Sequence, residues 1–416
     1  MARFLFTMLP VNDLGLPTRM LPIARALADR GHDVMVFNPA PAPMKLMEEA
    51  GLKSVPMPAR EMPAPVFDLP TAHKAWDVEE FFAGLYGDEE FVRGATAVHV
   101  DLVRDAAPDV VVDSFNLLAC LAARILKIPL VTVVQGNFHP ASRGFLWWEA
   151  ERPSGLASVA GVLNKVAAEY GVAPVQRCDE LMAGDLSLII GTPETDPVDA
   201  AANAAHVGPI VWQRGNATLP GWVDALGHEQ PLIWVYSGNP RYGGAGSSPE
   251  PFDSIIVIRA AIEALKDAPV QVVLTTGYQE LPAEIGKLPE NFQHAAYLPG
   301  MAMAKRCDLM VHHGGHSSVM NGLMAGTPTL MIPTATERES NARRLVALGA
   351  GEVVMPSTLA DGEKQIDVAD FRAKVDRVLA DPGYRQSAQR VAESMRQYGG
   401  AQMAADYIEE FASLKA

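Results

Sequence analysis

The chain is organised around residues 308–351, which read DLMVHHGGHSSVMNGLMAGTPTLMIPTATERESNARRLVALGAG. Residues 308–311 and 329–332 are short apolar runs, and each predicts a buried strand. Between them lies a glycine-rich turn, HHGG, and then a helix for which Ser317 and Ser318 are suitable N-cap residues. A helix that begins directly after a strand presents N–H groups and a partial positive charge, which suit a phosphate. This stretch therefore predicts a phosphate site.

A charged loop follows the second of these strands. Residues 334–339 read TATERE, and they would lie at the same edge of a parallel sheet as the glycine-rich turn. One β-α-β unit would then hold a polar pocket beside the phosphate site. The alternative stays open that the glycines only shape the turns of an ordinary crossover, because a glycine-rich turn alone is weak evidence.

Length and composition limit the class of protein. A chain of 416 residues predicts two or three domains, and 49% hydrophobic with 20% charged residues is typical of a soluble globular protein. The net charge of −15 argues against general binding to nucleic acid or to anionic membranes. Three widely spaced cysteines match no metal site. With no signal-peptide pattern and no apolar run of about 18 residues, we expect a cytoplasmic protein without a membrane span.

Strand and helix patterns alternate along the chain and predict an α/β fold with parallel sheets. Strands are predicted at residues 4–9, 34–37, 109–113, 130–134, 186–190, 232–236, 270–274 and 296–298. Helices are predicted at residues 76–103, 117–126, 252–265, 368–379, 382–398 and 401–414. The periodicity breaks near residues 209–227, which are rich in Pro, Gly and Asn. We therefore expect the domains 1–212 and 231–398, a linker at 213–230, and a C-terminal helix at 399–416 that could cross back to the first domain.

Several motifs resemble those of family 1 glycosyltransferases, in particular the bacterial enzymes for natural products and macrolides. HHGGHSSVMNGLMAGTPTLMIP with NARRLVALGAG is similar to the family's nucleotide-sugar signature, and YLPG at 297–300 stands where the family has W-x-P-Q. Residues 22–34 resemble its first helix and second strand, whereas 39–100 and 138–230 match weakly. The resemblance implies the GT-B fold, two doubly wound Rossmann-like domains facing each other across a cleft. It also implies a UDP- or dTDP-sugar as co-substrate.

The resemblance implies donor contacts residue by residue. Tyr297 would stack on the pyrimidine, and the Leu298 backbone would pair with its edge. His313 and the N–H groups near Ser317 and Ser318 would hold the diphosphate. The other expected donor residues are Ser237, Gly238, Gly314, Gly315 and Asn321.

Three positions depart from the family pattern. Asn321 stands where the family has a Glu on the ribose hydroxyls, so that contact is altered. Glu337 and Arg338 stand where the family has Asp-Gln, and we expect them to hold the sugar. Arginine adds a charge and a fork of donors, which would favour a carboxylate or acetamido sugar unless Arg338 turns away to pair with Glu339. For His312 we expect a structural role.

The resemblance leaves the catalytic base open. Enzymes of the family invert the anomeric carbon by direct displacement, and a His in a G-H-x-x-P loop takes the proton of the acceptor while a strand-end Asp orients it. Here the loop at 9–17 reads LPVNDLGLP and places Leu16 or Leu14, according to the alignment, in that position. Asp113 corresponds to the orienting Asp.

Three accounts of the base follow. In the first, which we adopt, Asp13 is the base, and a nearby Asp113 in an apolar cleft would raise a carboxyl pKa toward the useful range. In the second, Asp113 acts alone or His139 reaches in. In the third, the acceptor needs little base or no sugar is transferred. Asp13 could instead serve a turn or a helix cap, and Asp113 could bind backbone at its strand end.

Aromatic residues of the first domain predict a hydrophobic small-molecule acceptor, although each could equally be core packing. The acceptor candidates are Trp76, Phe82, Phe138, His139, Trp147 and Trp148. No metal is expected, because the chain has no Asp-x-Asp and the helix N-terminus with His313 could balance the charge of the leaving group. A nucleotide-sugar epimerase or hydrolase and a non-catalytic nucleotide-sugar-binding partner are the alternative functions. We expect a monomer or homodimer.

Overall fold

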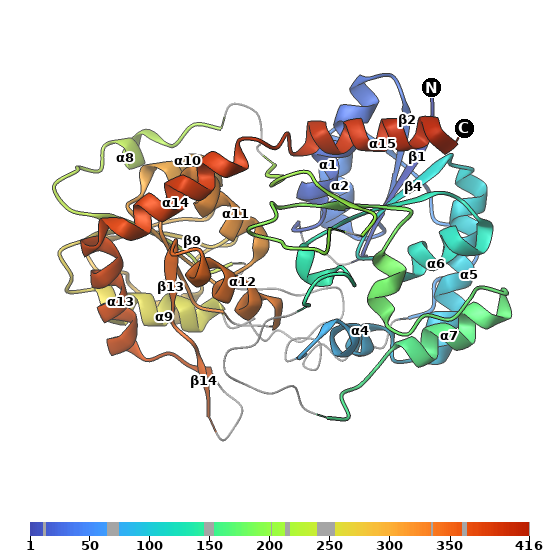
Figure 1. The fold of residues 1–416 in the computed structure, drawn as a ribbon. Coiled ribbons are helices and arrows are strands. Elements are labelled where there is room, and N and C mark those ends of the chain that lie inside the picture. The colour runs from blue at the N-terminus through green and yellow to red at the C-terminus, as the bar shows by residue number, and fades with distance from the viewer. Residues whose placement is uncertain are drawn as a thin grey trace. The chain divides into compact units, whose positions relative to one another are not determined.

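The chain forms two compact units, Met1–Trp212 with Tyr398–Ala416, and Gln213–Gln397. Each is built of parallel strands and helices, as Figure 1 shows, so the expected α/β class is confirmed. The computed structural model describes residues 1–10, 14–64, 75–144, 154–200, 202–212, 217–238, 254–333, 336–359 and 364–415.

The first unit contains a seven-stranded parallel sheet in the order β3-β2-β1-β4-β5-β6-β7. The strands β1, β4 and β5 are nearly continuous apolar runs, because helices cover both faces of the sheet. The strand order reverses between β1 and β4, as in the doubly wound Rossmann arrangement. The strands are β1 (Arg3–Met8), β2 (Asp33–Phe37), β3 (Lys53–Ser54), β4 (Val110–Ser114), β5 (Leu130–Val134), β6 (Leu186–Ile189) and β7 (Ala204–His206).

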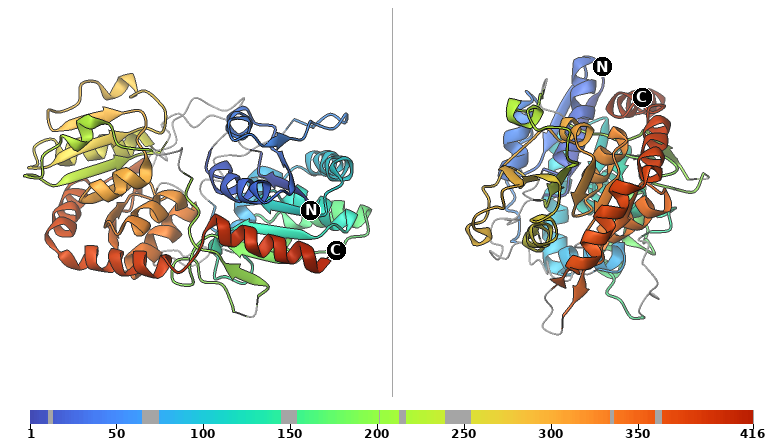
Figure 2. Two further views of the ribbon diagram at one scale, coloured as in Figure 1. Left: turned by 90° about the horizontal axis from the view of Figure 1, so that it is seen from above. Right: turned by 90° about the vertical axis from the view of Figure 1, so that its left-hand side faces the viewer.

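Helices pack on both faces of this sheet. Alternate residues of β1 point to opposite sides: Leu5 belongs to the core under α4, α5, α6 and α7, while Phe4 and Phe6 belong to the core under α1, α2 and α15. The C-terminal helix α15 lies beside α1 (Figures 1 and 2). These helices are α1 (Pro17–Asp29), α2 (Pro41–Glu49), α4 (Val78–Tyr86), α5 (Glu89–Ala106), α6 (Leu117–Leu126), α7 (Ala160–Glu169) and α15 (Ala401–Lys415), with short 3-10 turns η1 (Gly136–Phe138) and η2 (Cys178–Met182).

The helix expected at 76–103 is in fact two helices. Asp77 caps α4 by accepting from Glu80 N, and Asp88 caps α5 by accepting from Phe91 N. The break between them falls at Gly87, the C-cap of α4. The aspartate at 88 offers its side chain to the backbone at a helix start, which favours a new helix there over continuation of the first.

The second unit repeats the plan with a six-stranded parallel sheet in the order β10-β9-β8-β11-β12-β13. Its strand order reverses between β8 and β11. The strands are β8 (Leu232–Tyr236), β9 (Gln271–Thr275), β10 (Phe292–Ala295), β11 (Leu309–His312), β12 (Thr329–Met331) and β13 (Gly351–Val353), and a separate hairpin joins β14 (Ser357–Thr358) to β15 (Lys364–Gln365). The helices are α8 (Gly221–Asp224), α9 (Ser254–Leu265), α10 (Gly300–Arg306), α11 (His316–Ala325), α12 (Thr336–Ala347), α13 (Val368–Ala380) and α14 (Pro382–Met395), with the turn η3 (Ala283–Ile285).

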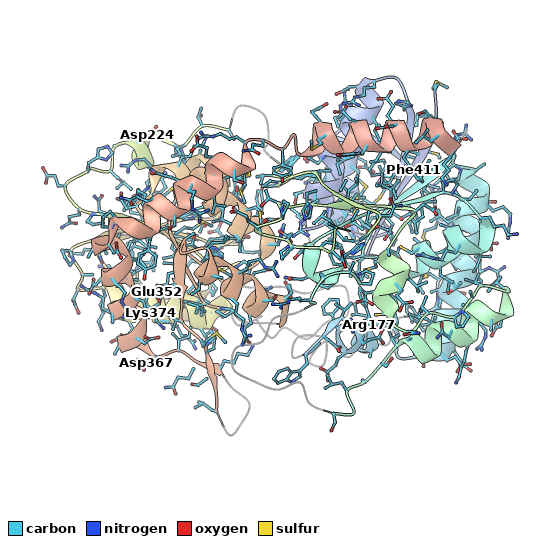
Figure 3. The ribbon with its side chains drawn as sticks, viewed as in Figure 1. Arg177, Asp224, Glu352, Asp367, Lys374 and Phe411 are labelled. Carbon is cyan, nitrogen blue, oxygen red and sulfur yellow. The ribbon has the colours of Figure 1, made fainter. Side chains whose placement is uncertain are left out.

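Polar contacts secure the outer helices of this unit. Asp367 begins α13 by accepting from the N–H groups of Ala369 and Asp370, and its side chain lies at that helix end in Figure 3. Glu352 of β13 accepts from Tyr384 Oη at 2.5 Å and from Arg377 Nη1 at 2.9 Å. One carboxylate thus ties α13 and α14 to the edge strand.

Two expectations for the second unit were wrong. The strand placed at 296–298 lies earlier, at Phe292–Ala295, because Pro299 opens the helix α10. The charged loop at 334–339 is largely helical, since α12 already begins at Thr336. Within the segment 213–230, which stays a predicted linker, Gly221–Asp224 forms the short helix α8. No helix in the described part of the chain is long and apolar enough to cross a membrane.

Candidate functional site

The glycine-rich turn lies at the carboxyl end of β11, beside the carboxyl end of β8, where the strand order of the second sheet reverses. Ligands bind at such switch points in doubly wound sheets. The N-cap of α11 is Gly315, not Ser317 or Ser318, which occupy the second and third helical positions. The Ser318 N–H donates to Gly315 O at 2.9 Å, so this amide is already engaged within the helix start. The expectation of serine caps was therefore wrong, although the helix does begin at the turn.

Gly314 allows the turn to press against α12. Its φ of +93° favours glycine, and a Cβ built there would lie 2.9 Å from Arg338 Cβ and 3.0 Å from Met331 Cε. Asn341 of α12 is buried and donates from Nδ2 to Gly314 O at 3.0 Å. Asn341 was not among the site residues expected from the sequence, although it stands in the NARRL motif. This contact joins the glycine-rich turn to the helix that carries Glu337 and Arg338.

The two histidines of the turn have different surroundings. His312 is fully buried, and its Nδ1 accepts from Gly314 N at 3.0 Å. Burial lowers the pKa of His312 to about 3, so this ring is a neutral structural group, as expected. His313 is half-buried and packs edge-to-face on Tyr236, with ring centroids 5.5 Å apart. A Cβ on Gly238 would lie 3.1 Å from His313 Nδ1, so this glycine permits the close approach of the ring.

His313 is neutral in this state. Burial, then the charge of Arg338, then His312 lower the pKa of His313 well below its ordinary value. A neutral imidazole can donate one hydrogen bond but brings no positive charge. Without a ligand, the positive groups near this turn are therefore Arg338 and the N-terminus of α11, and His313 adds no charge to them.

The expected nucleoside residues lie after β10 and on α11. Tyr297 is 37% exposed and stacks on Tyr278, while Leu298 is buried. Asn321 lies against the start of α10, since a Cβ on Gly300 would be 3.2 Å from Asn321 Nδ2. The Oδ1 atom of Asn321 is buried and has no hydrogen-bond partner among the described residues. Asn321 stands at the position where the family has the Glu that would contact the ribose.

The expected sugar residues lie in the first turn of α12. Glu337 and Arg338 are both half-buried, and Arg338 Nε lies 4.0 Å from Glu337 Oε1. Glu339 pairs with Arg343 at 3.2 Å. Ser237, at the end of β8, is 1% exposed and its hydroxyl donates to Gly238 O at 3.2 Å. All these residues follow strand ends of one sheet edge, as the motif predicts.

In the first unit, Asp113 stands at the carboxyl end of β4, beside β1. Its carboxylate is completely buried and accepts from Thr7 Oγ1 at 2.7 Å, from Asn116 N at 3.0 Å and from Cys120 Sγ at 3.2 Å. Burial raises the pKa of Asp113 to about 7, although these hydrogen bonds oppose the rise. The Asp113 carboxyl therefore has a pKa near neutrality, but hydrogen-bond donors of the protein, including Thr7, surround it.

A buried histidine supports this end of the sheet. His99 Nδ1 donates to Ala95 O at 2.7 Å, and its Nε2 accepts from Asn116 Nδ2 at 3.1 Å. Burial lowers the pKa of His99 to about 4. His99 was not among the residues expected from the sequence. Because it is neutral and 1% exposed, it fixes Asn116 rather than exchanging protons with a substrate.

The expected base, Asp13, lies outside the described residues, as do Trp147 and Trp148. Leu14 and Leu16, of which one or the other stands in the position of the family His according to the alignment, are half-buried and pack on the cores of the first unit. Neither leucine side chain can act as a general base, because it has no group that accepts a proton. The loop therefore contains no titratable side chain among its described residues.

The remaining acceptor candidates are more enclosed than expected. Phe82 is fully buried and Phe138 is 3% exposed, and both belong to the core. His139 is 4% exposed, accepts from Ala141 N at 3.2 Å through Nδ1, and has a pKa lowered to about 4, first by burial. Trp76 is half-buried. Apolar packing within the aromatic cluster explains the burial of the two phenylalanines, because Phe138 contacts Phe115 edge-to-face at 4.6 Å.

Phe115 has an unusual backbone. Its φ is +66°, which is rare for a bulky residue, and it directly follows β4, two residues after Asp113. Such strain concentrates at functional sites. The switch point of the first sheet thus combines a buried carboxyl with a strained aromatic residue. Within the described ranges, no group of three or more His, Cys, Asp and Glu side chains is placed to bind a metal ion.

A known protein-family model matches the C-terminal part of the chain. Residues 259–409 match the model of the C-terminal domain of erythromycin biosynthesis protein CIII-like proteins. Over 331 residues the chain is 25% identical to a PGL/p-HBAD biosynthesis glycosyltransferase of Mycobacterium tuberculosis (strain ATCC 25177 / H37Ra), covering 74% of this chain and 72% of the relative.

Solved structures extend the match to the whole chain. The spinosyn forosaminyltransferase SpnP is 19% identical with a TM-score of 0.70, and 99% of each chain is covered. The glycosyltransferase VinC, solved in complex with dTDP, is 20% identical with a TM-score of 0.66, again over 99% of each chain. The chain therefore has the GT-B fold, its residues 259–409 match an EryCIII-like C-terminal domain, and the relatives that it resembles are glycosyltransferases.

Proposed function

We propose that the chain transfers a sugar from a UDP- or dTDP-sugar to a hydrophobic small-molecule acceptor, with inversion at the anomeric carbon. The observation that carries the proposal is the contact between the turn at Gly314 and the helix α12. Arg338 packs against Gly314, and Asn341 donates to its carbonyl oxygen. It brings a helix N-terminus, a guanidinium and a carboxylate to one sheet edge, which are the groups that a nucleotide sugar requires. The similar enzyme VinC was solved with dTDP, and SpnP is named for its action on spinosyn, which supports both substrate classes.

The donor half of the reaction follows from this arrangement. The α11 N-terminus and Arg338 would hold the diphosphate, His313 would donate one hydrogen bond to it, and Glu337 would accept from sugar hydroxyls. No resident metal is part of the proposal. Activity that is unchanged by excess EDTA is the expected result, and its loss would refute this part.

We assign proton removal to Asp13 and a positioning role to Asp113. Asp113 is enclosed by three donors, so it supports the ends of β1 and β4 and does not itself meet the acceptor in this state. In the reaction, Asp13 would take the hydroxyl proton while the acceptor oxygen forms the new bond to the anomeric carbon. The bond from that carbon to the β-phosphate oxygen breaks, and the nucleoside diphosphate leaves with the electron pair.

Proton removal is tested by the variant Asp13→Asn. We expect turnover at saturating substrates to slow by roughly two to four orders of magnitude, the usual contribution of a general base, while donor affinity stays unchanged. Asp109→Asn is the control, because Asp109 lies at the opposite end of β4, where it accepts from Arg3 N. If Asp13→Asn retains full activity, Asp13 is not the base.

The donor class is tested with a panel of UDP- and dTDP-sugars and the free nucleotides. Binding should raise the melting temperature in a concentration-dependent way. A panel of hydrophobic phenols and macrolactones then tests transfer by mass spectrometry. If no nucleotide or nucleotide sugar stabilises the protein, the proposed function is wrong. Donor consumption without any glycoside product would indicate hydrolysis instead.

The cysteines bear on where the enzyme would act. All three are free and buried, which suits the reducing cytoplasm in which we expect the enzyme to work. Burial also raises the pKa of the Cys307 thiol to about 12, so this group stays protonated and unreactive at neutral pH.

A further inference from the structure

Two exposed tyrosines form a stack at the edge of the second unit. The ring centroids of Tyr278 and Tyr297 lie 4.2 Å apart, and the rings are inclined by only 11°. Tyr278 is 46% exposed and Tyr297 is 37% exposed. Single exposed aromatic rings are common on protein surfaces, whereas two exposed rings in contact form a small apolar patch that is informative. The two rings already touch, and no third ring fits between them.

The backbone of Tyr278 has an unfavourable conformation for a bulky residue. Its φ is +70°, in the left-handed region that favours glycine. The Tyr278 N–H donates to Ala296 O at 2.7 Å, which ties the loop after β9 to the residue before Tyr297. Thr276 Oγ1 bonds His294 Nε2 at 2.9 Å and also Gln279 O, which closes the loop. Strain that the surroundings enforce in this way is typical of functional positions.

The stack continues into the candidate donor site. Pro299 and Gly300 follow Tyr297 closely and begin α10. Gly300 packs against Trp234, with its Cβ position 3.7 Å from Cη2, and against Asn321 of α11. The chain therefore leads from the stacked rings to the residue at the expected ribose position and then to the phosphate turn.

We propose that Tyr278 is a donor-positioning residue, which backs one face of Tyr297 so that the nucleobase stacks as a third ring on the outer face of the pair. The inference rests on the proposed function, because it takes Tyr297 as the base-stacking residue. Tyr278 would act through Tyr297. It holds that ring in a fixed plane before the donor arrives, so that less side-chain freedom is lost on binding.

The test is calorimetric titration of UDP and of dTDP into the full chain and its variants. Tyr278→Gly removes the ring and also accepts the left-handed φ, so folding is not at risk. Tyr278→Phe keeps the ring, and Tyr170→Ala is a control at a tyrosine of similar exposure (39%) in the first unit. We expect Tyr278→Gly to raise the Kd about three- to tenfold, the range of one aromatic pair, and the other two variants to match the unaltered protein.

Kinetics separate positioning from a merely structural role. Tyr278→Gly should raise the KM for the donor by the same factor, leave kcat at saturating donor unchanged, and not lower the melting temperature. An unchanged or smaller Kd for Tyr278→Gly, while Tyr297→Ala loses binding, would overturn the inference and leave the proposed function intact. If the unaltered protein binds neither nucleotide, the proposed function fails and the inference with it.

Discussion

Gly314 and Gly31 have similar backbones but different surroundings, and this pair shows what the glycine-rich turn requires. Their φ values are +93° and +87°, yet a Cβ on Gly31 meets nothing within 4 Å, while one on Gly314 meets Arg338 Cβ at 2.9 Å. The first position needs glycine for its conformation alone. Position 314 also leaves no room for a side chain, because the atom that a Cβ would meet is Arg338 Cβ, which is attached directly to the α12 backbone and cannot move aside on its own.

The pair gives a prediction for stability. Gly31→Ala should cost about 1 to 2 kcal/mol from backbone strain. Gly314→Ala should cost a further 1 to 3 kcal/mol, roughly, from overpacking and should also weaken nucleotide binding, because α12 must shift. Urea unfolding and calorimetric titration of UDP measure the two effects. Equal losses of stability in both variants would contradict this account, because they would show that α12 moves away from the added methyl group at little cost.

Asp113 gives a prediction for the dependence on pH. Its folded pKa of about 7 is above the unfolded value of about 3.9, so the unfolded state releases this proton first. The free energy of unfolding therefore falls as pH rises from about 4 to 7, by about 1.4 kcal/mol per unit. Asp113→Asn removes this titration. Between about pH 5 and pH 7 the unaltered protein should lose roughly 2 to 3 kcal/mol relative to the variant in urea unfolding. Parallel pH profiles would contradict this account.

At the scale of elements, a buried glutamate from one helix caps another. Glu79 of α4 is 5% exposed and accepts from Ser158 Oγ at 2.6 Å, Val159 N at 3.0 Å and Ala160 N at 3.2 Å, and also from Cys178 N. Val159, the N-cap of α7, has no side-chain oxygen of its own. Glu79 thus satisfies the start of α7 and joins it to η2.

Replacing this carboxylate tests the arrangement. Burial alone would raise the pKa of Glu79, but the hydrogen bonds from Cys178, Ser158 and Ala160 outweigh it and the pKa is lowered. Its contribution is therefore present above the unfolded pKa and is lost as pH falls through the folded pKa. Glu79→Gln should cost about 1.5 to 3 kcal/mol at neutral pH in urea unfolding. Glu89→Gln, at an exposed ion pair with Lys165, should change little. Equal stability of the two variants would remove Glu79 from this role.

Elements with long, bounded apolar runs could be predicted to the residue, as at α6, β5 and β8. In α6 the side chain of Asn116 marks the start by accepting from Ala119 N. The strands β7 and β13 have only three residues each and carry no periodic pattern. Their existence depends on pairing with a neighbouring strand, which composition does not encode.

The same contrast holds for the site. The positions of His313, Gly314 and Gly315 could be predicted because one continuous segment places them between a strand end and a helix start. Tyr278 could not, since it meets Tyr297 only when the loop after β9 folds against the end of β10. The enclosure of Asp113 was also hidden, because Thr7 comes from the adjacent strand β1.

At the scale of the whole molecule, the first unit is assembled from both ends of the chain. Ile408 of α15 is fully buried in the core that also contains Phe4 and Phe6. Arg30 pairs with Asp406 at 2.6 Å and with Glu409 at 3.0 Å at the edge of this contact. The last helix of the chain is therefore part of the unit that the chain begins with.

Burial rather than the ion pairs should dominate this contact. Ile408→Ala should cost about 2 to 5 kcal/mol from the lost burial and the remaining cavity. Leu414→Ala, on the same helix but 78% exposed, should have little effect. Thermal unfolding compares the two variants. A small loss for Ile408→Ala would mean that α15 is not part of the core.

Because α15 is translated after the whole second unit, the first unit cannot be completed early during synthesis. Residues 213–397 are translated after the first 212 and before α15, which takes on the order of ten seconds or more at the usual rate of translation. During that interval the apolar surface of α1 that α15 covers stays open to water while the second unit folds. Nascent chains should therefore be prone to aggregate until α15 has emerged from the ribosome. A permuted gene that begins at Tyr398 would close the first unit before the second is made.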